Sequence, residues 1–484
     1  MNVRRIIVSA AALWIAPSVH AMSLGDAVRE SIQNSPEVRE AALGLDRAML
    51  EEPGILALTD PVFSLSVSAT DDRGPRASPA FQGAYSRSND WEAAVSQDLL
   101  IGTESKLFLK SEDLQSPSNF RSVDPTITTT FGVEVRQPLW RNFHGRPDKA
   151  KRRQARAGVS AAQGALDRAR EREAARAMIA FADVCTAQEQ IVIREAALAD
   201  AEKLLKTYQE KKRYGLVDAS DLIQAEVSAR TQETELRLGR SALKQAEEAL
   251  RRALYRKDAS AFGPLRLPDL PSKSIPTAEE AWARAAANRG DYRSEVHRVE
   301  RAENFEQVEK LRTLPDLALV GEYEWAGLSN RSGQSWRDVR DADKPYYKTG
   351  IELEIPFFGR QETVRREEAA LLLKTARARR DQVEADLRQE VSEALESLRL
   401  AQDRAAAYKE LVDLEKRKLA AAQEDFQRGR SSTDILIRFQ SDIHRTESQL
   451  LEANADLFMQ WARLSLATGT LLEDFAAHVG ERSP

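Results

Sequence analysis

The sequence predicts a mainly helical protein that also carries a few strands of the kind that cross membranes. Three observations predict this class. Residues 146–256 and 360–470 are rich in Ala, Glu, Arg, Leu and Gln, the composition of long helices that pack on each other. Two other regions, about 61–138 and 315–356, alternate polar and apolar residues as half-buried strands do. The two halves of the chain also share one order of elements, which predicts an internal two-fold repeat.

The first 21 residues resemble a secretory signal peptide. They contain the basic start MNVRR, the apolar core IIVSAAALWIA, and small residues at the two cleavage positions, Val19 and Ala21. An N-terminal membrane anchor is the alternative, but this core is shorter than the roughly 18 apolar residues that span a bilayer. No later segment reaches that length, so the mature chain either stays soluble in the periplasm or crosses a membrane as strands.

Matching segments indicate the repeat. LGDAVRESIQNSPEV starts at residue 24 and aligns with AEEAWARAAANRGDY, which starts at 278, an offset of 254. VEVRQPL starts at 133 and aligns with IELEIPF, which starts at 351, an offset of only 218. The difference places 36 extra residues in the first half, among them WEAAVSQ and SKLFLK. These extra residues fit either additional strands or an external loop.

We expect each repeat to run through a short helix, a strand region, a long helix, a sharp break and a medium helix. The first repeat covers 22–257 and the second covers 276–484. A linker rich in Pro, Ser and Leu joins the two repeats over 258–275.

Four segments have the alternation of strands: FSLSVSA, ITTTFGVEVR, LALVGEYEW and YKTGIELEI. Their apolar side chains stand at every second position, so one face is apolar and the other is polar. Sixteen of the 31 aromatic residues lie within 61–143 and 317–358, as expected for the aromatic belts of membrane strands. The β-core of a soluble protein is the alternative. The polar face gathers five carboxylates that would line a lumen and favour cations: Glu134, Glu322, Glu324, Glu352 and Glu354.

Four strands per chain are too few to close a barrel in a membrane, since about eight is the minimum. Open sheet edges do not occur in lipid, because their backbone groups would have no hydrogen-bond partners. Transmembrane strands in this chain would therefore need several copies in one barrel, and three copies of four strands would supply 12.

Four helices dominate the pattern and form two pairs, each with a long first member: 146–214 with 217–256, and 360–428 with 433–470. Each long helix has about 69 residues and is about 100 Å long at the α-helical rise. Gly215 and Gly429 stand at the two breaks and suit the left-handed conformation that ends a helix. We therefore expect two long helical hairpins that turn at these glycines.

The sequence has no motif that indicates catalysis, a cofactor or a metal. It lacks a nucleophile elbow, a phosphate-binding glycine loop and the paired His or Cys spacings of zinc sites. Cys185 is the single cysteine and stands in a helical run, as a small buried residue would. The basic cluster within 146–156 is interpreted as solvated helix surface. We expect no enzyme activity, no cofactor and no nucleic-acid partner.

The signal peptide, the doubled plan, the strand endings QPLW and IPFFG, and the glycine breaks together resemble the TolC-like outer-membrane efflux and secretion channels. The resemblance covers essentially the whole mature chain. It implies a homotrimer whose strands form one shared 12-stranded β-barrel in outer-membrane lipid and whose helical hairpins form a periplasmic tunnel. It also implies a passive exit duct of a tripartite efflux or type I secretion system, docked to a periplasmic adaptor (a membrane fusion protein) and an inner-membrane pump.

The resemblance also assigns roles to residues at the two breaks. The family's acidic periplasmic gate falls on Asp434, with Asp221 as its counterpart in the first half. A further family acid would fall on Ile437, so one acidic ring is expected here and a second is left open. The alternative for both aspartates is a charge favoured by the helix dipole. The adaptor-contacting tips fall on Tyr214, Gly215, Leu216 and Val217, and on the more polar Arg428, Gly429, Arg430 and Ser431.

A soluble periplasmic coiled-coil scaffold or adaptor is the alternative function. It predicts a monomer or dimer that needs no detergent, whereas a channel requires a membrane. The sequence leaves open the exported substrate (drug, metal ion or protein) and the class of pump.

Overall fold

The computed structural model describes residues 22–118, 121–214, 218–258, 262–268, 275–341, 345–428, 430 and 433–479. The expected signal peptide and both break glycines, Gly215 and Gly429, lie outside these residues. The chain divides into two compact units. The first comprises the residues up to Ala42, Ala165–Asp291 and the residues from Glu384 onward; the second comprises Leu43–Gly164 and Tyr292–Val383.

Helices make up most of the described chain, as predicted. Two long helices, α5 (Arg146–Arg213) and α10 (Arg360–Gln427), contain 68 residues each. They are followed by the medium helices α6 (Ala219–Ala253) and α11 (Thr433–Thr468). All these bounds lie close to the expected ranges, because runs of Ala, Glu, Arg and Leu favour helix and few Gly or Pro interrupt them.

Two of the shorter helices begin where the sequence supplies a capping box. A capping box built by Ser and Asp opens α1 (Leu24–Asn34), and one built by Thr and Glu opens α7 (Ala278–Asn288). None of the described helices is both long and apolar enough to cross a membrane. The other short elements are α2 (Pro36–Met49), α3 (Glu51–Ala57), α4 (Pro79–Gln82), the 3-10 turn η1 (Phe143–Gly145), α8 (Gly290–Arg312), α9 (Ser332–Asp341) and α12 (Leu471–Val479).

The core of the first unit includes residues of α1, α5, α6, α11 and α12. Met178, Phe181 and Cys185 of α5 are almost fully buried in it, together with Leu250 of α6 and Leu471 of α12. The α5 residues recur at intervals of three and four, the spacing of one buried helix face. Burial raises the pKa of the Cys185 thiol to about 12, so this cysteine is a packing residue with little thiolate character.

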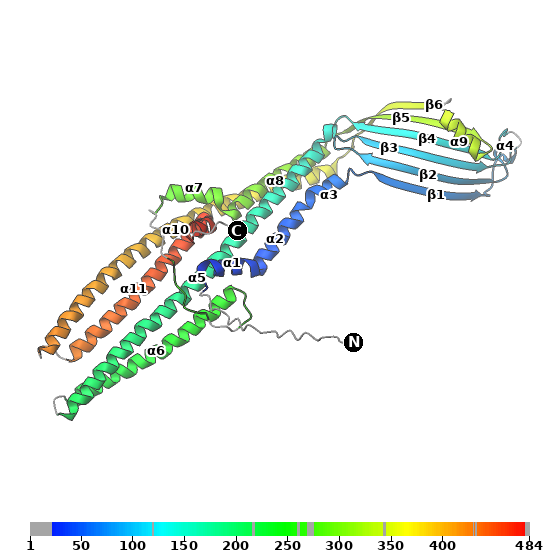
Figure 1. The fold of residues 1–484 in the computed structure, drawn as a ribbon. Helices are drawn as coiled ribbons and strands as arrows, with labels where there is room; N and C mark the ends of the chain where they lie inside the picture. The colour runs from blue at the N-terminus through cyan, green and yellow to red at the C-terminus, as the bar shows by residue number, and fades with distance from the viewer. Residues whose placement is uncertain are drawn as a thin grey trace, which may run out of the picture. The chain divides into compact units, whose positions relative to one another are not determined.

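The second unit contains one antiparallel sheet of six strands in chain order (Figure 1): β1 (Val62–Asp72), β2 (Ser86–Asp98), β3 (Glu104–Gln115), β4 (Thr126–Pro138), β5 (Asp316–Ser329) and β6 (Pro345–Glu354). The expectation of four strands per chain is therefore wrong. The extra residues of the first half form the β2–β3 hairpin rather than an external loop. The sequence left strands and a loop as alternatives for these residues, because runs of three apolar residues, Ala93–Val95 and Leu107–Leu109, interrupt the alternation of both segments.

Cross-strand pairing separates two faces of the sheet. Directly paired residues point to the same side, and one row of such pairs runs through Leu65, Ala93, Leu109, Phe131 and Trp325. This face, which we call the apolar face, continues to both edges of the sheet. Its next row is Phe63, Val95, Leu107, Val133, Tyr323 and Tyr347.

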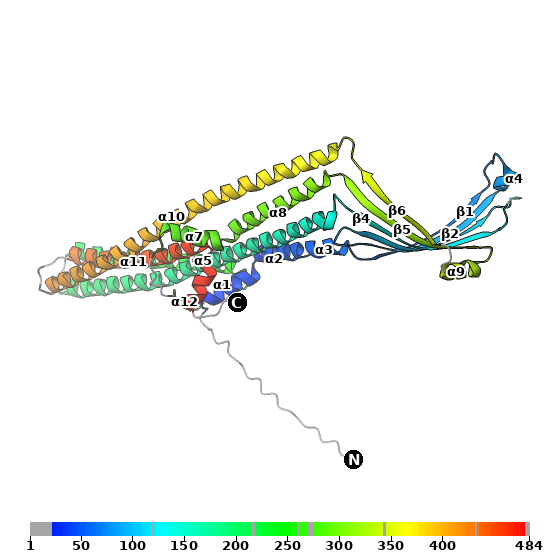
Figure 2. The same cartoon turned by 90° about the horizontal axis from the view of Figure 1, so that it is seen from above.

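The short helix α9 covers one end of the apolar face, where it packs on β4 and β5 (Figure 2). Buried Ser335 accepts a hydrogen bond from the Thr129 N–H (3.0 Å) and donates one to the Gly327 carbonyl (2.8 Å). A Cβ on Gly327 would lie 2.1 Å from the backbone oxygen of Ser335. Gly327 is therefore required for the close approach of α9.

Gly327→Ala should push α9 off the sheet and lower the free energy of unfolding by about 2 kcal/mol, the typical cost of forcing atoms into occupied space. Gly321→Ala is the matched control on the same strand and face, since no atom lies within 4 Å of its Cβ. Thermal unfolding followed by the heat-dependent shift in gel migration compares the two. Equal melting temperatures would contradict the tight contact at Gly327.

Candidate functional site

The face opposite the apolar face, here called the polar face, holds the five glutamates that were expected to line a lumen. Glu134 pairs directly with Glu322 across β4 and β5. Glu324 lies two residues beyond Glu322 and so points the same way. The pairing of β5 with β6 adds Glu352 and Glu354 to this face. The structure therefore brings together carboxylates from strands far apart in the sequence.

Cations stand among these carboxylates. The alternation places Arg136 and Lys348 on the polar side of their strands, but sequence reasoning missed Lys106, Lys110 and every ion pair that the four cations form. They come from β3, β4 and β6, and each forms ion pairs across the polar face. The pairs are Lys106–Glu92 (2.7 Å), Lys110–Glu324 (3.3 Å), Lys348–Glu322 (3.8 Å), and Arg136 with Glu104 (3.1 Å), Asp316 (2.9 Å) and Glu352 (3.7 Å).

Carboxylates nevertheless outnumber cations on the polar face. Within the six strands, these four cations face twelve acidic residues, so the surface has a net negative charge. The acids are Asp72, Asp90, Glu92, Asp98, Glu104, Glu112, Glu134, Asp316, Glu322, Glu324, Glu352 and Glu354.

The C-terminal ends of α5 and α10 and the N-terminal ends of α6 and α11 meet in an apolar cluster. Leu204 and Tyr208 of α5 and Leu436 of α11 are buried in it, and Phe426 of α10 packs against them. The Lys211 ammonium lies 5.3 Å from the centre of the Phe426 ring, a cation–π distance. This cluster holds the two helical hairpins together next to their breaks.

Three of the eight expected tip residues are described. Tyr214 follows α5 and its side chain is 80% exposed. Arg428 follows α10 and pairs with Glu424 on that helix, and Arg430 is exposed. The other five lie outside the described residues: Gly215, Leu216, Val217, Gly429 and Ser431.

The two expected gate aspartates, Asp221 and Asp434, stand in the first turns of α6 and α11, where the helix dipole favours a carboxylate. Asp434 pairs with Arg438 (2.8 Å) and accepts a hydrogen bond from Gln224 of α6 (3.0 Å). The Arg438 hydrogen bond, followed by that of Gln224, lowers the pKa of Asp434, which is therefore ionised at neutral pH. Ile437 packs against the apolar cluster of the hairpin ends.

A buried charge cluster in the first unit had no signal in the sequence. Arg289, at the junction of α7 and α8, is only 3% exposed. It pairs with Glu390 of α10 (2.7 Å) and Asp291 (2.9 Å), and it donates to the Ala467 carbonyl of α11 (3.0 Å). Arg168 of α5 lies 3.4 Å from Asp291. The cluster therefore ties four helices of this unit together.

Glu171, one turn after Arg168 on α5, is 7% exposed and one of its oxygens has no hydrogen-bond partner. Burial raises the pKa of Glu171 to about 7, and the nearby charges of Arg168 and Arg289 oppose that rise. This carboxyl group therefore changes its charge near neutral pH.

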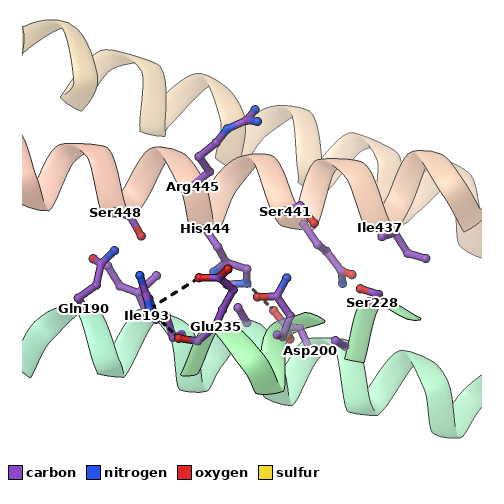
Figure 3. A pocket seen from close by; sticks show the side chains of 15 residues that line it. Gln190, Ile193, Asp200, Ser228, Glu235, Ile437, Ser441, His444, Arg445 and Ser448 are labelled. Carbon is purple, nitrogen blue, oxygen red and sulfur yellow. Dashed lines mark hydrogen bonds and ion pairs between the residues drawn. The ribbon is translucent and has the colours of Figure 1, made fainter. Parts of the chain in front are cut away.

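A polar cavity of about 300 Å³ lies among α5, α6 and α11 (Figure 3). His444 Nε2 lies 3.1 Å from Asp200, and Arg194 lies 3.7 Å from the Glu235 carboxylate. These pairs connect the helices that line the cavity. Among the described residues no three His, Cys, Asp or Glu side chains are grouped to hold a metal ion.

Residues 282–470 match the family model described as outer membrane efflux protein. No curated protein matches the sequence of this chain closely. Solved structures of outer-membrane channels share its fold, although they share little of its sequence.

The outer membrane channel CmeC of Campylobacter jejuni is 14% identical, with 97% of this chain and 94% of that chain covered and a TM-score of 0.63. The outer membrane protein VceC of Vibrio cholerae is 16% identical, with 92% and 96% covered and a TM-score of 0.61. The MtrE outer membrane channel of Neisseria gonorrhoeae, in its open state, is 16% identical, with 93% and 90% covered and a TM-score of 0.62.

Proposed function

We propose that this chain, a TolC-like outer-membrane efflux protein by family match and fold, is the exit duct of a tripartite efflux or type I secretion system. Residues 1–21 direct it to the periplasm, the sheet crosses the outer membrane and the helices form a periplasmic tunnel. The ends of the helical hairpins dock to an adaptor that is bound to an inner-membrane pump. The duct is passive: its cargo passes through it, and it catalyses no reaction.

The observation that carries the proposal is the apolar face of the sheet. Tyr347 and Ile351 on β6 are 75% and 72% exposed, and Val67 on β1 is 76% exposed. β1 has 11 residues and β6 has 10, which matches the roughly 9–11 residues with which a tilted strand crosses the apolar band of a membrane. An exposed apolar face opposite a charged face suits strands with lipid on one side and water on the other.

Aromatic residues stand at two levels of the sheet, as membrane interfaces require. Phe131, Tyr323 and Trp325 cluster toward the α9 end, with ring centres 4.6 to 5.6 Å apart. Phe357 and Phe358 follow β6 at the other end and are 93% and 77% exposed. These two levels bracket the aliphatic part of the apolar face.

The assembly is proposed to be a homotrimer built from two repeats per chain, 22–257 and 276–484. The equal lengths of α5 and α10 support the repeat, as do the capping boxes that open α1 and α7. A six-stranded sheet falls short of the roughly eight strands that close a membrane barrel, so several copies must share one wall.

Membrane fractionation tests the proposal against a soluble periplasmic scaffold or adaptor. The mature chain should sediment with the outer membrane, require detergent for extraction and run as a trimer whose migration changes on heating. A monomer or dimer in the soluble periplasmic fraction would reject the duct.

Asp434→Ala should raise the conductance of the reconstituted duct and weaken its block by divalent cations. Carboxylates from three chains near one axis repel each other unless cations bridge them, and Asp434 is ionised and accepts a hydrogen bond from Gln224 of α6. Single-channel recording in planar bilayers measures both effects.

Arg438→Ala is the matched control with the opposite expected sign. It removes the cation that pairs with Asp434 at 2.8 Å, so divalent block should strengthen. Unchanged conductance and block in both variants would remove Asp434 from the gate.

The duct should also prefer cations, because acidic residues dominate the polar face that would line its lumen. A salt gradient across the bilayer should give a reversal potential of cation-selective sign. Glu134 and Glu354 form no ion pair among the described residues, and replacing both by Gln should reduce that potential. A wild-type potential of anion-selective sign would reject the polar face as the lining.

A further inference from the structure

The β2–β3 hairpin is built into the middle of the sheet. β2 pairs with β1 from Ser86 to Ser96, and β3 pairs with β4 from Glu104 to Leu114, without a bulge in either ladder. The hairpin therefore adds two full-length strands to the wall of the sheet instead of projecting from it.

Side-chain contacts also fix the hairpin to its neighbours. The Phe108 ring of β3 covers Gly132 of β4, where a Cβ would lie 2.4 Å from the ring. Lys106 and Lys110 flank that ring at 5.2 and 5.1 Å from its centre. Lys110 reaches Glu324 on β5 (3.3 Å), so the hairpin is tied across β4 to the second half of the chain.

The register shows that the hairpin preserves the two faces of the sheet. Val62 on β1 pairs with Ser96, Ser96 pairs with Lys106, and Lys106 pairs with Glu134 on β4. Without the hairpin, β1 would run antiparallel to β4 with Val62 opposite Glu134. The apolar residues of β1 would then lie on the same side of the sheet as those of β4. The hairpin thus changes the number of strands and leaves the orientation of both faces unchanged.

The two edges of the sheet are β1 and β6, and each is paired on one side only within the described chain. Every residue of β1 is exposed, and so is every residue of β6 except Gly350. The apolar face extends to both edges through Phe63 and Tyr347. An edge that enters lipid must be paired, because its backbone groups have no other partners there. The six strands alternate in direction, so β1 can pair antiparallel with β6 of a neighbouring copy.

We propose that three copies join β1 to the neighbour's β6 and close an 18-stranded barrel, in place of the 12-stranded wall implied by four strands per chain. This inference rests on the proposed trimeric duct. With strands about 4.8 Å apart and tilted by about 40°, 18 strands give a backbone diameter of about 36 Å, against about 24 Å for 12 strands. The duct therefore opens to the outside through a lumen wide enough for bulky hydrophilic solutes.

Electron cryomicroscopy of the full mature chain in lipid nanodiscs counts the strands directly. A trimer with 18 strands supports the proposal. A trimer with 12 strands and the hairpin outside the wall overturns it but leaves the duct intact, and so does a dimer with 12 strands. The absence of any membrane assembly overturns the duct as well.

Polymer exclusion gives an independent readout. Neutral polymers of increasing size are added on the strand side of a bilayer, and their entry is detected as a fall in single-channel conductance. The matched variant lacks Ser86–Gln115, which places β1 beside β4 with both faces preserved. The wild type should admit polymers at least about 1.5-fold wider than this variant does, following the linear growth of diameter with strand number. Equal cut-offs would overturn the proposal, and if the variant does not assemble, the strand count of the wild type decides.

Discussion

Arg289→Met should lower the free energy of unfolding of the first unit by about 3–5 kcal/mol, the usual cost of breaking a buried ion pair from one side. The substitution leaves Glu390 and Asp291 without their nearest cation and leaves the Ala467 carbonyl without its donor. Arg168 lies 3.9 Å from Glu390 and can take over only part of this charge. Urea unfolding followed by circular dichroism at the helical band measures the change.

Arg399→Met is the control for this prediction. Arg399 lies on α10 in the same unit and pairs with Glu396 (2.8 Å), with both side chains about half exposed or more. An exposed pair of this kind contributes less than about 1 kcal/mol. If the two variants unfold at the same urea concentration, the buried cluster does not stabilise the unit.

Glu171→Gln should stabilise the protein at pH 8 and have little effect at pH 4.5. The pKa of Glu171 is about 7 in the folded chain, raised from 4.5 by burial. Because the folded state holds this proton more tightly than the unfolded state, the stability that the group contributes is complete below pH 4.5. That stability is lost as pH rises through 7. A pKa raised from 4.5 to about 7 corresponds to a loss of about 3 kcal/mol at pH 8, and the neutral amide of Gln avoids this loss.

Melting temperatures of wild type and Glu171→Gln, measured from pH 4.5 to pH 8, test this prediction. The two curves should separate progressively above pH 5. Glu396→Gln provides the control, because Glu396 is 70% exposed on α10 and its replacement should give a pH profile parallel to that of the wild type. A constant difference between Glu171→Gln and wild type across this range would show that Glu171 does not titrate as proposed.

Elements with a strong local pattern were predicted from the sequence. The resemblance to TolC-like channels is confirmed by the family match and by the solved folds. In the long helices apolar residues recur every three to four positions. In the strands β1, β4, β5 and β6 they recur at every second position, so residues close together in the sequence were enough to predict these elements. In β2 and β3 the apolar runs Ala93–Val95 and Leu107–Leu109 interrupt the alternation, so the period of two alone left a strand and a loop as alternatives.

The charged site on the polar face was predicted only in part, because the alternation shows on which side of its own strand a residue lies and nothing about the neighbouring strand. Alternation alone put Glu322 and Glu324 on the polar side of their strand, but it could not show that Lys348 and Lys110 pair with them.

The helices, the strands with one apolar and one polar face, and the family resemblance could all be predicted from the sequence, because each depends on residues a few positions apart. The number of strands in the sheet, the charge pairs across the polar face and the contact of Arg289 with Glu390 became known from the folded chain. These features depend on contacts between segments that are far apart in the sequence. Strand register and helix packing determine those contacts, and no short stretch of the chain encodes either.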